Sequence, residues 1–216
     1  LTIGITGQTG CGKTALLRRI EARGGCGVDC DALYYDLLRT DGALRAALMD
    51  AFGHVFLPNG TLDRKKLGGL VFSDPAQLDT LNRIVYSHVR RAVETIRAEK
   101  KACGCALFAV DAINLIQSGL AGFCDVTVGI TAPQEVRLAR IMARDGIERQ
   151  KAEKRADGGA LGQNAGGGEE RDDEGQNELH QKRDERHGKK AEAEAVEITL
   201  RRESGVGASM GGFLLY

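Results

Sequence analysis

The sequence of 216 residues lacks several features that would point to other classes of protein. It has no tryptophan, only 5% aromatic residues and no net charge, since 30 acidic residues balance 30 basic ones. The absence of a strongly basic region argues against a nucleic-acid partner. The sequence also has no basic-then-apolar leader and no apolar run of about 18 residues, so we expect a cytoplasmic protein without a membrane partner.

The six cysteines form neither a Cys-x-x-Cys pair nor a set with the spacing of zinc ligands. We therefore expect reduced thiols in a cytosolic protein. Glycine, by contrast, is abundant at 29 residues, and the most informative motif of the chain is built from it.

Residues 7–14 read GQTGCGKT, a complete Gly-x-x-x-x-Gly-Lys-Thr phosphate loop. The motif follows a short apolar alternation and precedes an amphipathic helix pattern, which is the order that distinguishes it from a plain glycine-rich turn. Its backbone N–H groups and the positive end of the helix dipole would form an anion cradle. The expected ATP-binding residues of the loop are Gly7, Gln8, Thr9, Gly10, Cys11, Gly12, Lys13 and Thr14. Lys13 would reach the β- and γ-phosphates, and Thr14 would hold Mg²⁺.

The first 147 residues alternate between strand and helix patterns, which predicts an α/β fold: a parallel sheet of the P-loop NTPase type flanked by helices. The expected strands cover residues 1–5, 27–31, 105–110 and 126–130. Helices are expected after the phosphate loop, over 34–52 with a break near 40–42, from Leu62, from Pro75 and from Pro133.

The pattern dissolves from Glu148 onward. Residues 148–190 contain 21 charged residues but only two large aliphatic ones, Leu161 and Leu179. Such a stretch buries too little apolar surface to offset its ordering entropy. We expect 148–216 to be a charged, glycine-rich tail that is disordered or aberrant, for instance through an altered reading frame. Some helical character is visible over 191–200, but no final strand of the sheet.

Acidic residues follow two of the expected strands. Asp29 and Asp31 end the second strand, and Asp111 follows the buried run Cys105–Val110. In an open α/β sheet the ligand crevice lies at the carboxyl ends of strands, where a carboxylate can accept a proton or bind near a metal. The alternatives are a helix cap for Asp29 and an ordinary turn residue for Asp111.

Three arginines, which we call the arginine stripe, recur at helical spacing on the last expected helix: Arg137, Arg140 and Arg144. A mobile arginine helix can neutralise the charge that gathers during phosphoryl transfer. For Arg137 a solvated helix face is an equal alternative. No Asn-Lys-x-Asp guanine signature is visible, which disfavours a GTPase.

Several motifs taken together resemble one family, the dephospho-CoA kinases. They are GQTGCGKT, the strand end at Asp31, Phe52-Gly53, the turn Asn59–Arg64, Val71-Phe72 and Leu81-Asn82. The resemblance covers roughly residues 1–147. It implies transfer of the γ-phosphate of ATP to the ribose 3′-hydroxyl of dephospho-CoA, with a helical substrate region around residues 35–100 and a lid that begins near Arg140.

The resemblance also implies roles for individual residues. Asp31 matches the general base and a substrate contact, Lys13 and Thr14 the phosphate and metal contacts, and Arg64 a substrate-binding position. Arg140 matches a catalytic lid arginine and Arg144 an ATP-binding one, while Asp111 would lie near Mg²⁺.

Two stretches depart from the family pattern. The family's His-Pro is Tyr86-Ser87 here, and its Asp-x-Pro-Leu-Leu-x-Glu is Asp111-Ala-Ile-Asn114-Leu-Ile-Gln117. Two other functions therefore stay open: a different P-loop kinase acting on nucleosides or nucleotides, and an ATP-binding protein that has lost turnover. Cys11, at a helix N-terminus, is expected to have a lowered thiol pKa, so that its modification blocks ATP binding.

Overall fold

The computed structural model describes residues 1–157 and 197–202 of the chain. Its strands are β1 (Thr2–Thr6), β2 (Cys26–Asp29), β3 (Phe108–Asp111), β4 (Val126–Thr131) and β5 (Glu197–Arg202). Its α-helices are α1 (Lys13–Glu21), α2 (Cys30–Thr40), α3 (Gly42–Phe52), α4 (Arg64–Val71), α5 (Pro75–Ala102), α6 (Gln134–Asp145) and α7 (Arg149–Asp157), with a 3₁₀ turn, η1, over Leu120–Phe123. The predicted α/β fold is confirmed.

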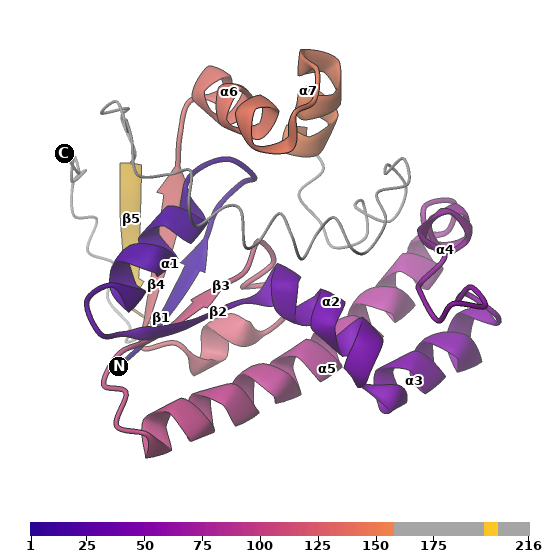
Figure 1. The fold of residues 1–216 in the computed structure, drawn as a ribbon, viewed down its shortest axis with the longest axis horizontal. Helices are drawn as coiled ribbons and strands as arrows, with labels where there is room; N and C mark the ends of the chain where they lie inside the picture. The colour runs from indigo at the N-terminus through magenta and orange to yellow at the C-terminus, as the bar shows by residue number, and fades with distance from the viewer. Residues whose placement is uncertain (158–196, 203–216) are drawn as a thin grey trace.

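The strands form one sheet in the order β2-β3-β1-β4-β5. The first four are parallel, as predicted, and β5 runs antiparallel to β4 at the edge (Figure 1). Strand β3 lies between β1 and β2. Asp111, the last residue of β3, therefore lies between the end of β1, which leads into the phosphate loop, and the end of β2.

The two faces of the sheet are covered by different helices. Helix α1 packs on one face over Ile5, Ala109 and Val128, and residues of the other face, such as Phe108 and Val110, belong to the larger core beneath α5. Alternate residues of β3 thus point to opposite faces, as strand geometry requires. Gly27 allows α1 to approach β2, because a Cβ there would lie 2.2 Å from a Leu17 methyl carbon.

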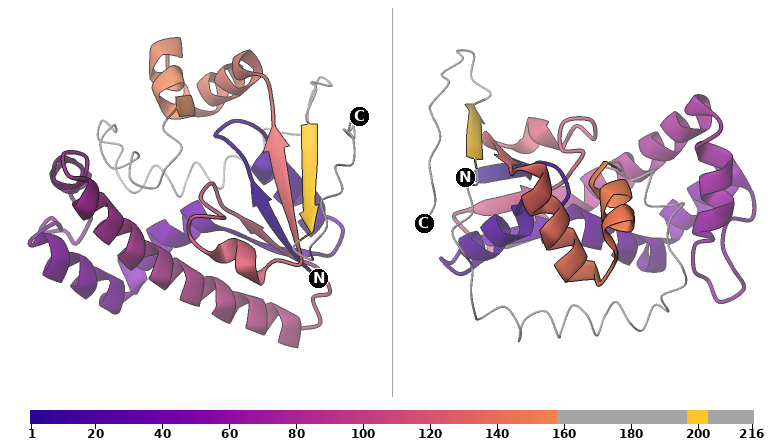
Figure 2. Two further views of the ribbon diagram at one scale, coloured as in Figure 1. Left: turned by 180° about the vertical axis from the view of Figure 1, so that it is seen from behind. Right: turned by 90° about the horizontal axis from the view of Figure 1, so that it is seen from above.

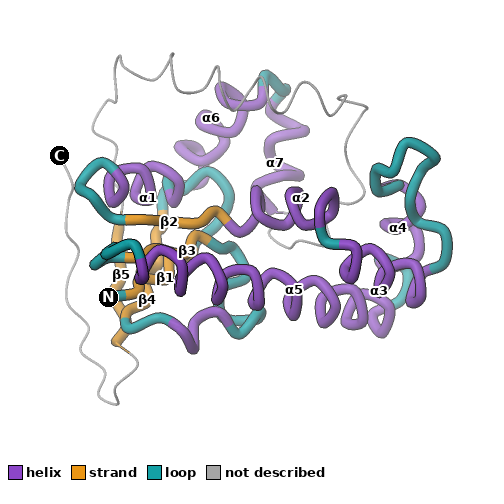
Figure 3. Tube along the Cα trace, turned by 60° about the horizontal axis from the view of Figure 1, so that its bottom comes forward, coloured by secondary structure: helices purple, strands orange, loops and turns teal. Residues whose placement is uncertain are grey.

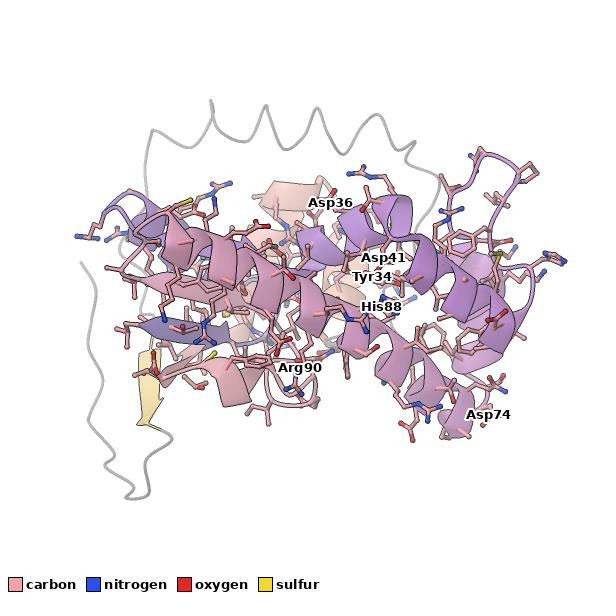
Figure 4. All side chains as sticks on the ribbon, turned by 90° about the horizontal axis from the view of Figure 1, so that it is seen from below. Tyr34, Asp36, Asp41, Asp74, His88 and Arg90 are labelled. Atoms are coloured by element: carbon pink, nitrogen blue, oxygen red, sulfur yellow. The ribbon has the colours of Figure 1, made fainter. Side chains whose placement is uncertain are left out.

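Helices α2 to α5 extend to one side of the sheet, and Figures 2 and 3 show α3 and α4 at the far end of the long helix α5. The helix junctions are fixed by aspartate caps. Asp41 Oδ1 accepts the N–H groups of Ala43 and Leu44, while Asp41 Oδ2 lies 2.7 Å from His88 Nδ1. Figure 4 shows these two side chains meeting where α2 and α3 join against α5.

Order extends beyond residue 147, which corrects the prediction for the tail. Helix α7 packs on α6 through Ala152 and Ala156, which meet Leu138 and Ile141 in a small cluster of their own. Residues 197–202 form a strand, not a helix, and supply the final strand that the sequence analysis did not find. The rest of the predicted tail lies outside the described residues.

The described residues also bear on the expectations about cysteine pairing and membrane spans. None of the six cysteines, all of which lie within residues 1–157, forms a disulfide. Among the helices described, none combines the length and the apolar character needed to cross a bilayer.

Candidate active site

The phosphate loop connects β1 to α1 and is shaped by its glycines. Gly7, Gly10 and Gly12 have φ values of 145°, 82° and 108°, a region that favours glycine. A Cβ on Gly7 would lie 2.2 Å from the carbonyl oxygen of Ile130, so no side chain fits there. Lys13 opens α1 and turns back over the loop, with Nζ 3.4 Å from the Gln8 carbonyl oxygen. The sequence therefore forms the predicted strand–loop–helix.

The environment of Cys11 differs from the one predicted for a reactive thiol. The residue is fully buried in the core between α1 and the sheet. Burial raises the pKa of its thiol, although the Lys13 charge and the Lys13 N–H oppose that rise. The predicted lowering of the pKa is therefore wrong, because the helix N-terminus is outweighed by loss of water. A buried, protonated thiol is a poor target for modification.

Three carboxylates, which we call the strand-end acids, gather at the carboxyl ends of β2 and β3: Asp29, Asp31 and Asp111. Asp111 pairs in register with both Asp29 and Ile5, so backbone hydrogen bonding aligns these positions. Asp29 Oδ1 accepts the N–H groups of Asp31 and Ala32, at 2.9 and 3.1 Å. The cap ends β2 two residues earlier than predicted and places Asp31 in the first turn of α2.

The strand-end acids share a crowded environment that perturbs two of them. Burial raises the pKa of Asp31, and Asp29 raises it further, while Lys13 and Arg144 lower it. Burial likewise raises the pKa of Asp111 to about 7. Lys13 and a hydrogen bond with Thr14 oppose that rise, whereas the other two acids add to it. A carboxylate with a raised pKa next to the lysine of a phosphate-loop motif suits proton transfer near neutral pH.

Thr14 and Asp111 together fit a Mg²⁺ ion. Their side chains hydrogen-bond to one another beside Lys13, and the buried Asp111 carboxylate is crowded by like charges that a cation would offset. The described residues contain no cluster of three or more His, Cys, Asp or Glu side chains that could hold a metal. Mg²⁺ does not need one, because it keeps several waters and binds through one or two protein ligands plus substrate phosphates.

Arg140 lies close to the phosphate loop, and Arg144 lies close to Asp31. Arg140 Nη1 donates to the carbonyl oxygens of Gly10 and Cys11, at 3.4 and 3.3 Å, which holds α6 over the phosphate loop. Arg144 donates through Nε and a second nitrogen to the Asp145 carboxylate, yet its charge still lowers the pKa of Asp31. The stripe therefore spans from the phosphate loop to Asp31.

Arg137 does not lie on a solvated face of α6. It is only 6% exposed, and its Nε and Nη1 have no hydrogen-bond partner within the described chain. The cause is close packing: a Cβ on Gly10 would lie 2.7 Å from the Arg137 carbonyl oxygen and 3.2 Å from its Cα. Helix α6 thus rests on the phosphate loop at Arg137, and the alternative of a solvated face is wrong for this residue.

Arg64 lies on the helical extension. It opens α4, and its guanidinium carbon is 4.7 Å from the centroid of the Tyr35 ring on α2. This contact links α4 to the turn of helix that follows Asp31. The predicted substrate-binding role of Arg64 stays a prediction.

A small pocket beside Asp31 contains residues that the sequence analysis did not assign. It is lined by Asp31, Cys30, Tyr86 and Asn114, together with Ser118 and apolar neighbours. Tyr86 comes from α5 and Asn114 from the loop after β3, so only the fold brings them together. The one sequence signal was that both positions depart from the family pattern.

Comparisons with known proteins point to one family. A family model described as dephospho-CoA kinase matches residues 1–161, which includes α7. The dephospho-CoA kinase of Geobacter sulfurreducens is 31% identical over 154 residues, 71% of this chain and 78% of that protein. The dephospho-CoA kinase of Anaeromyxobacter dehalogenans is 36% identical over 154 residues, 71% and 73% of the two chains.

A solved structure shares the fold. The crystal structure of TT1252 from Thermus thermophilus matches with a TM-score of 0.60 at 30% sequence identity, over 76% of this chain and 82% of that chain. Since the family model spans well over half of the sequence and the relatives above align over most of their own length, this chain belongs to the dephospho-CoA kinase family.

Proposed function

We propose that the chain carries out the dephospho-CoA kinase reaction of its family at the carboxyl ends of β1, β2 and β3, with Asp31 as the general base. ATP and dephospho-CoA are the substrates. The observation that carries the proposal is the position of Asp31. It is a largely buried carboxyl whose pKa burial raises, close enough to Lys13 of the phosphate loop for that charge to lower it again.

The residues then have distinct tasks. The loop N–H groups and Lys13 bind the phosphates, and Arg140 and Arg144 neutralise charge on the transferring group. Asp31 accepts the proton of the ribose 3′-hydroxyl while that oxygen bonds to the γ-phosphorus and the bond to the β–γ bridging oxygen breaks. ADP leaves with the electron pair. Thr14 and Asp111 would hold Mg²⁺, which supplies charge neutralisation at the phosphates.

Arg64 would contact the acceptor from the helical extension, which we propose as the substrate-binding region together with α2, α3 and α5. Helices α6 and α7 would form the lid. From the sequence we further propose that the protein works in the cytoplasm on small-molecule substrates, without nucleic-acid or membrane partners.

The test is to incubate the purified full chain with Mg-ATP and dephospho-CoA and to measure coenzyme A and ADP by chromatography. Equal amounts of both products are expected. A panel of nucleosides and nucleotides serves as the control, and none should be consumed at a comparable rate. Preferred use of another acceptor would identify a different P-loop kinase. ATP binding without any product would identify a nucleotide-binding protein that has lost turnover.

A further inference from the structure

Three of the six cysteines gather at the amino ends of β2 and β3, at the opposite end of these strands from the strand-end acids. Cys26 begins β2, and Cys103 and Cys105 lie in the turn between α5 and β3. Cys103 is exposed and the other two are partly exposed, whereas the remaining three cysteines are buried. Oxidants dissolved in water can therefore reach this group of thiols, which no step of the proposed phosphoryl transfer uses.

The turn after α5 holds Cys105 close to the start of β2. The Cys105 N–H donates to the Lys100 carbonyl oxygen at 3.0 Å, and Gly104 has the φ of 84° that lets the chain reverse at the end of the helix. Strand β3 follows, and its first residue, Phe108, pairs in register with Cys26. The backbone of the turn and of the sheet therefore positions both cysteines.

Cys26 and Cys105 meet at one backbone oxygen. The Leu107 carbonyl oxygen accepts the Cys26 N–H at 2.8 Å and the Cys105 thiol at 3.1 Å. The two side chains also hydrogen-bond to one another, and this contact is the largest cause that raises the pKa of Cys26. Cys103 acts on the Cys26 thiol through its charge and not through a hydrogen bond. Cys105 is therefore the partner of Cys26 within this group.

We propose that Cys26 and Cys105 are a redox site, at which an oxidant of the peroxide class converts the two thiols to a disulfide. The structure describes the reduced state, in which the side chains are already in contact. A disulfide needs its two Cβ atoms about 4 Å apart, so a pair of thiols in hydrogen-bond contact requires little movement to close the bond.

The oxidation is balanced by one molecule of hydrogen peroxide. One of the two sulfurs, as a thiolate, attacks a peroxide oxygen, so that the O–O bond breaks and a sulfenic acid and hydroxide form. The other sulfur, as a thiolate, attacks the sulfenic sulfur, forms the S–S bond and displaces a second hydroxide. The two thiol protons convert both hydroxides to water. The thiols lose two electrons, and the peroxide gains them.

The disulfide would stabilise the strand that leads to two of the strand-end acids. Within the described sheet β2 is an edge strand of four residues that pairs with β3 alone. It ends at Asp29, which caps the helix of Asp31. A covalent link at Cys26 would oppose fraying of this edge. It lies about 10 Å along the strand from Asp29, so it would not enter the active site.

The test treats the reduced full chain with hydrogen peroxide and blocks the remaining thiols with iodoacetamide. Digestion with trypsin and Asp-N protease isolates Cys26 in residues 24–28, and Cys103 with Cys105 in residues 102–110. Mass spectrometry should find these two peptides linked, and dithiothreitol should separate them. The melting temperature of the oxidised protein should rise by about 5 °C or more, because the disulfide closes a long loop of the unfolded chain.

Cys103→Ser is the matched control, because it removes the exposed thiol of the same turn. It should keep both the link and the rise in melting temperature. Cys26→Ser and Cys105→Ser should lose both. Serine is similar in size to cysteine, so all three reduced variants should melt within about 3 °C of the wild type. If Cys26→Ser or Cys105→Ser fails to fold, the wild type and Cys103→Ser decide the question.

Three results of the peptide analysis would overturn the proposal: no linked peptide in the wild type, a disulfide between Cys103 and Cys105 within residues 102–110, or a link that persists in Cys105→Ser. A link that leaves the melting temperature unchanged, or lowers it, would also overturn it, because the bond would then form only by distorting the fold. None of these measurements depends on turnover, so the result is independent of the proposed function.

Discussion

The strand-end acids and the arginine stripe carry opposite charges into the same site but are positioned differently. The acids lie on two segments, the β2–α2 junction and the end of β3, which the hydrogen bonds of the sheet and one helix cap hold in register. The arginines share one face of α6, yet Arg137 is buried with two nitrogens unpaired among the described residues, Arg140 donates to the phosphate loop and Arg144 pairs with the neighbouring Asp145.

The two sets of residues therefore differ in how much their charged groups contribute to holding the structure in place. Backbone pairing fixes the acids whether or not they are ionised, so removing one charge should change chemistry without moving the others. The arginines are fixed by their own contacts, so removing one should also change how α6 rests on the loop. Substitutions within each set can test this contrast.

The largest effect is expected for Asp31→Asn. The amide keeps the shape of the side chain but cannot accept the proton, so kcat should fall by at least about 10²-fold with KM for ATP unchanged. Steady-state kinetics and ATP calorimetry measure the two quantities. Asp36→Asn is the control, because Asp36 is on the same helix but exposed and paired with Arg39. A kcat close to that of the wild type would remove Asp31 from the role of base.

Arg140→Ala should follow, with effects on both chemistry and ATP binding. It removes a positive charge and the two hydrogen bonds to the loop carbonyl oxygens. We expect kcat/KM for ATP to fall by about 10- to 100-fold, with Arg140→Lys recovering little, because a single ammonium does not reproduce the guanidinium fork. Arg149→Ala is the control, since that exposed residue of α7 makes surface ion pairs of small value. If Arg149→Ala lowers activity as much, the loss reflects lid packing.

The sequence predicted the parts of this site that local pattern determines. A glycine loop between a strand and a helix requires one backbone shape, so residues 7–14 and the helix from Lys13 could be placed without a structure. The parallel sheet followed from alternation, and the cap at Asp29 was one of two stated alternatives. The interruption of the helical pattern near Asp41 was also visible.

Properties that depend on packing could not be predicted. The spacing of Arg137 gives its helix face, but only tertiary contact with Gly10 shows that this face is buried. Cys11 has the helix N-terminus that suggests a reactive thiol, yet the core around it reverses the effect. Helix α7 buries only two alanines against α6, too weak a pattern to separate from a solvated tail.

Asp111→Asn should have a smaller effect on the nucleotide-free protein, and in the stabilising direction. Burial raises the Asp111 pKa from its usual 3.8 to about 7, so the folded protein binds this proton more tightly than the unfolded chain. Stability therefore falls as pH rises from about 4 to about 7, and the ionised group destabilises the protein above that range. Without that charge, the melting temperature at pH 8 should rise by about 5 °C.

The control for Asp111→Asn is the same measurement at pH 5, where only part of the stability lost between about pH 4 and about pH 7 is gone, so the difference in melting temperature should be less than half of that at pH 8. Activity should be lost at both pH values, because the amide is a weaker ligand for Mg²⁺. An equal difference in melting temperature at both pH values would contradict the pKa argument and leave only a packing effect.

The smallest effect, Arg137→Met, tests whether the buried member of the arginine stripe costs stability. The guanidinium is 6% exposed with two nitrogens unpaired in the described structure, and a methionine fills similar space without a charge to desolvate. We expect a rise in the free energy of unfolding of about 1–2 kcal/mol, measured by urea denaturation. Arg83→Met, an exposed position on α5, should stay within about 0.5 kcal/mol of the wild type. A lower stability for Arg137→Met would mean that its charge is matched within the folded chain, and the contrast between fixed acids and partner-dependent arginines would then extend to all three members of the stripe.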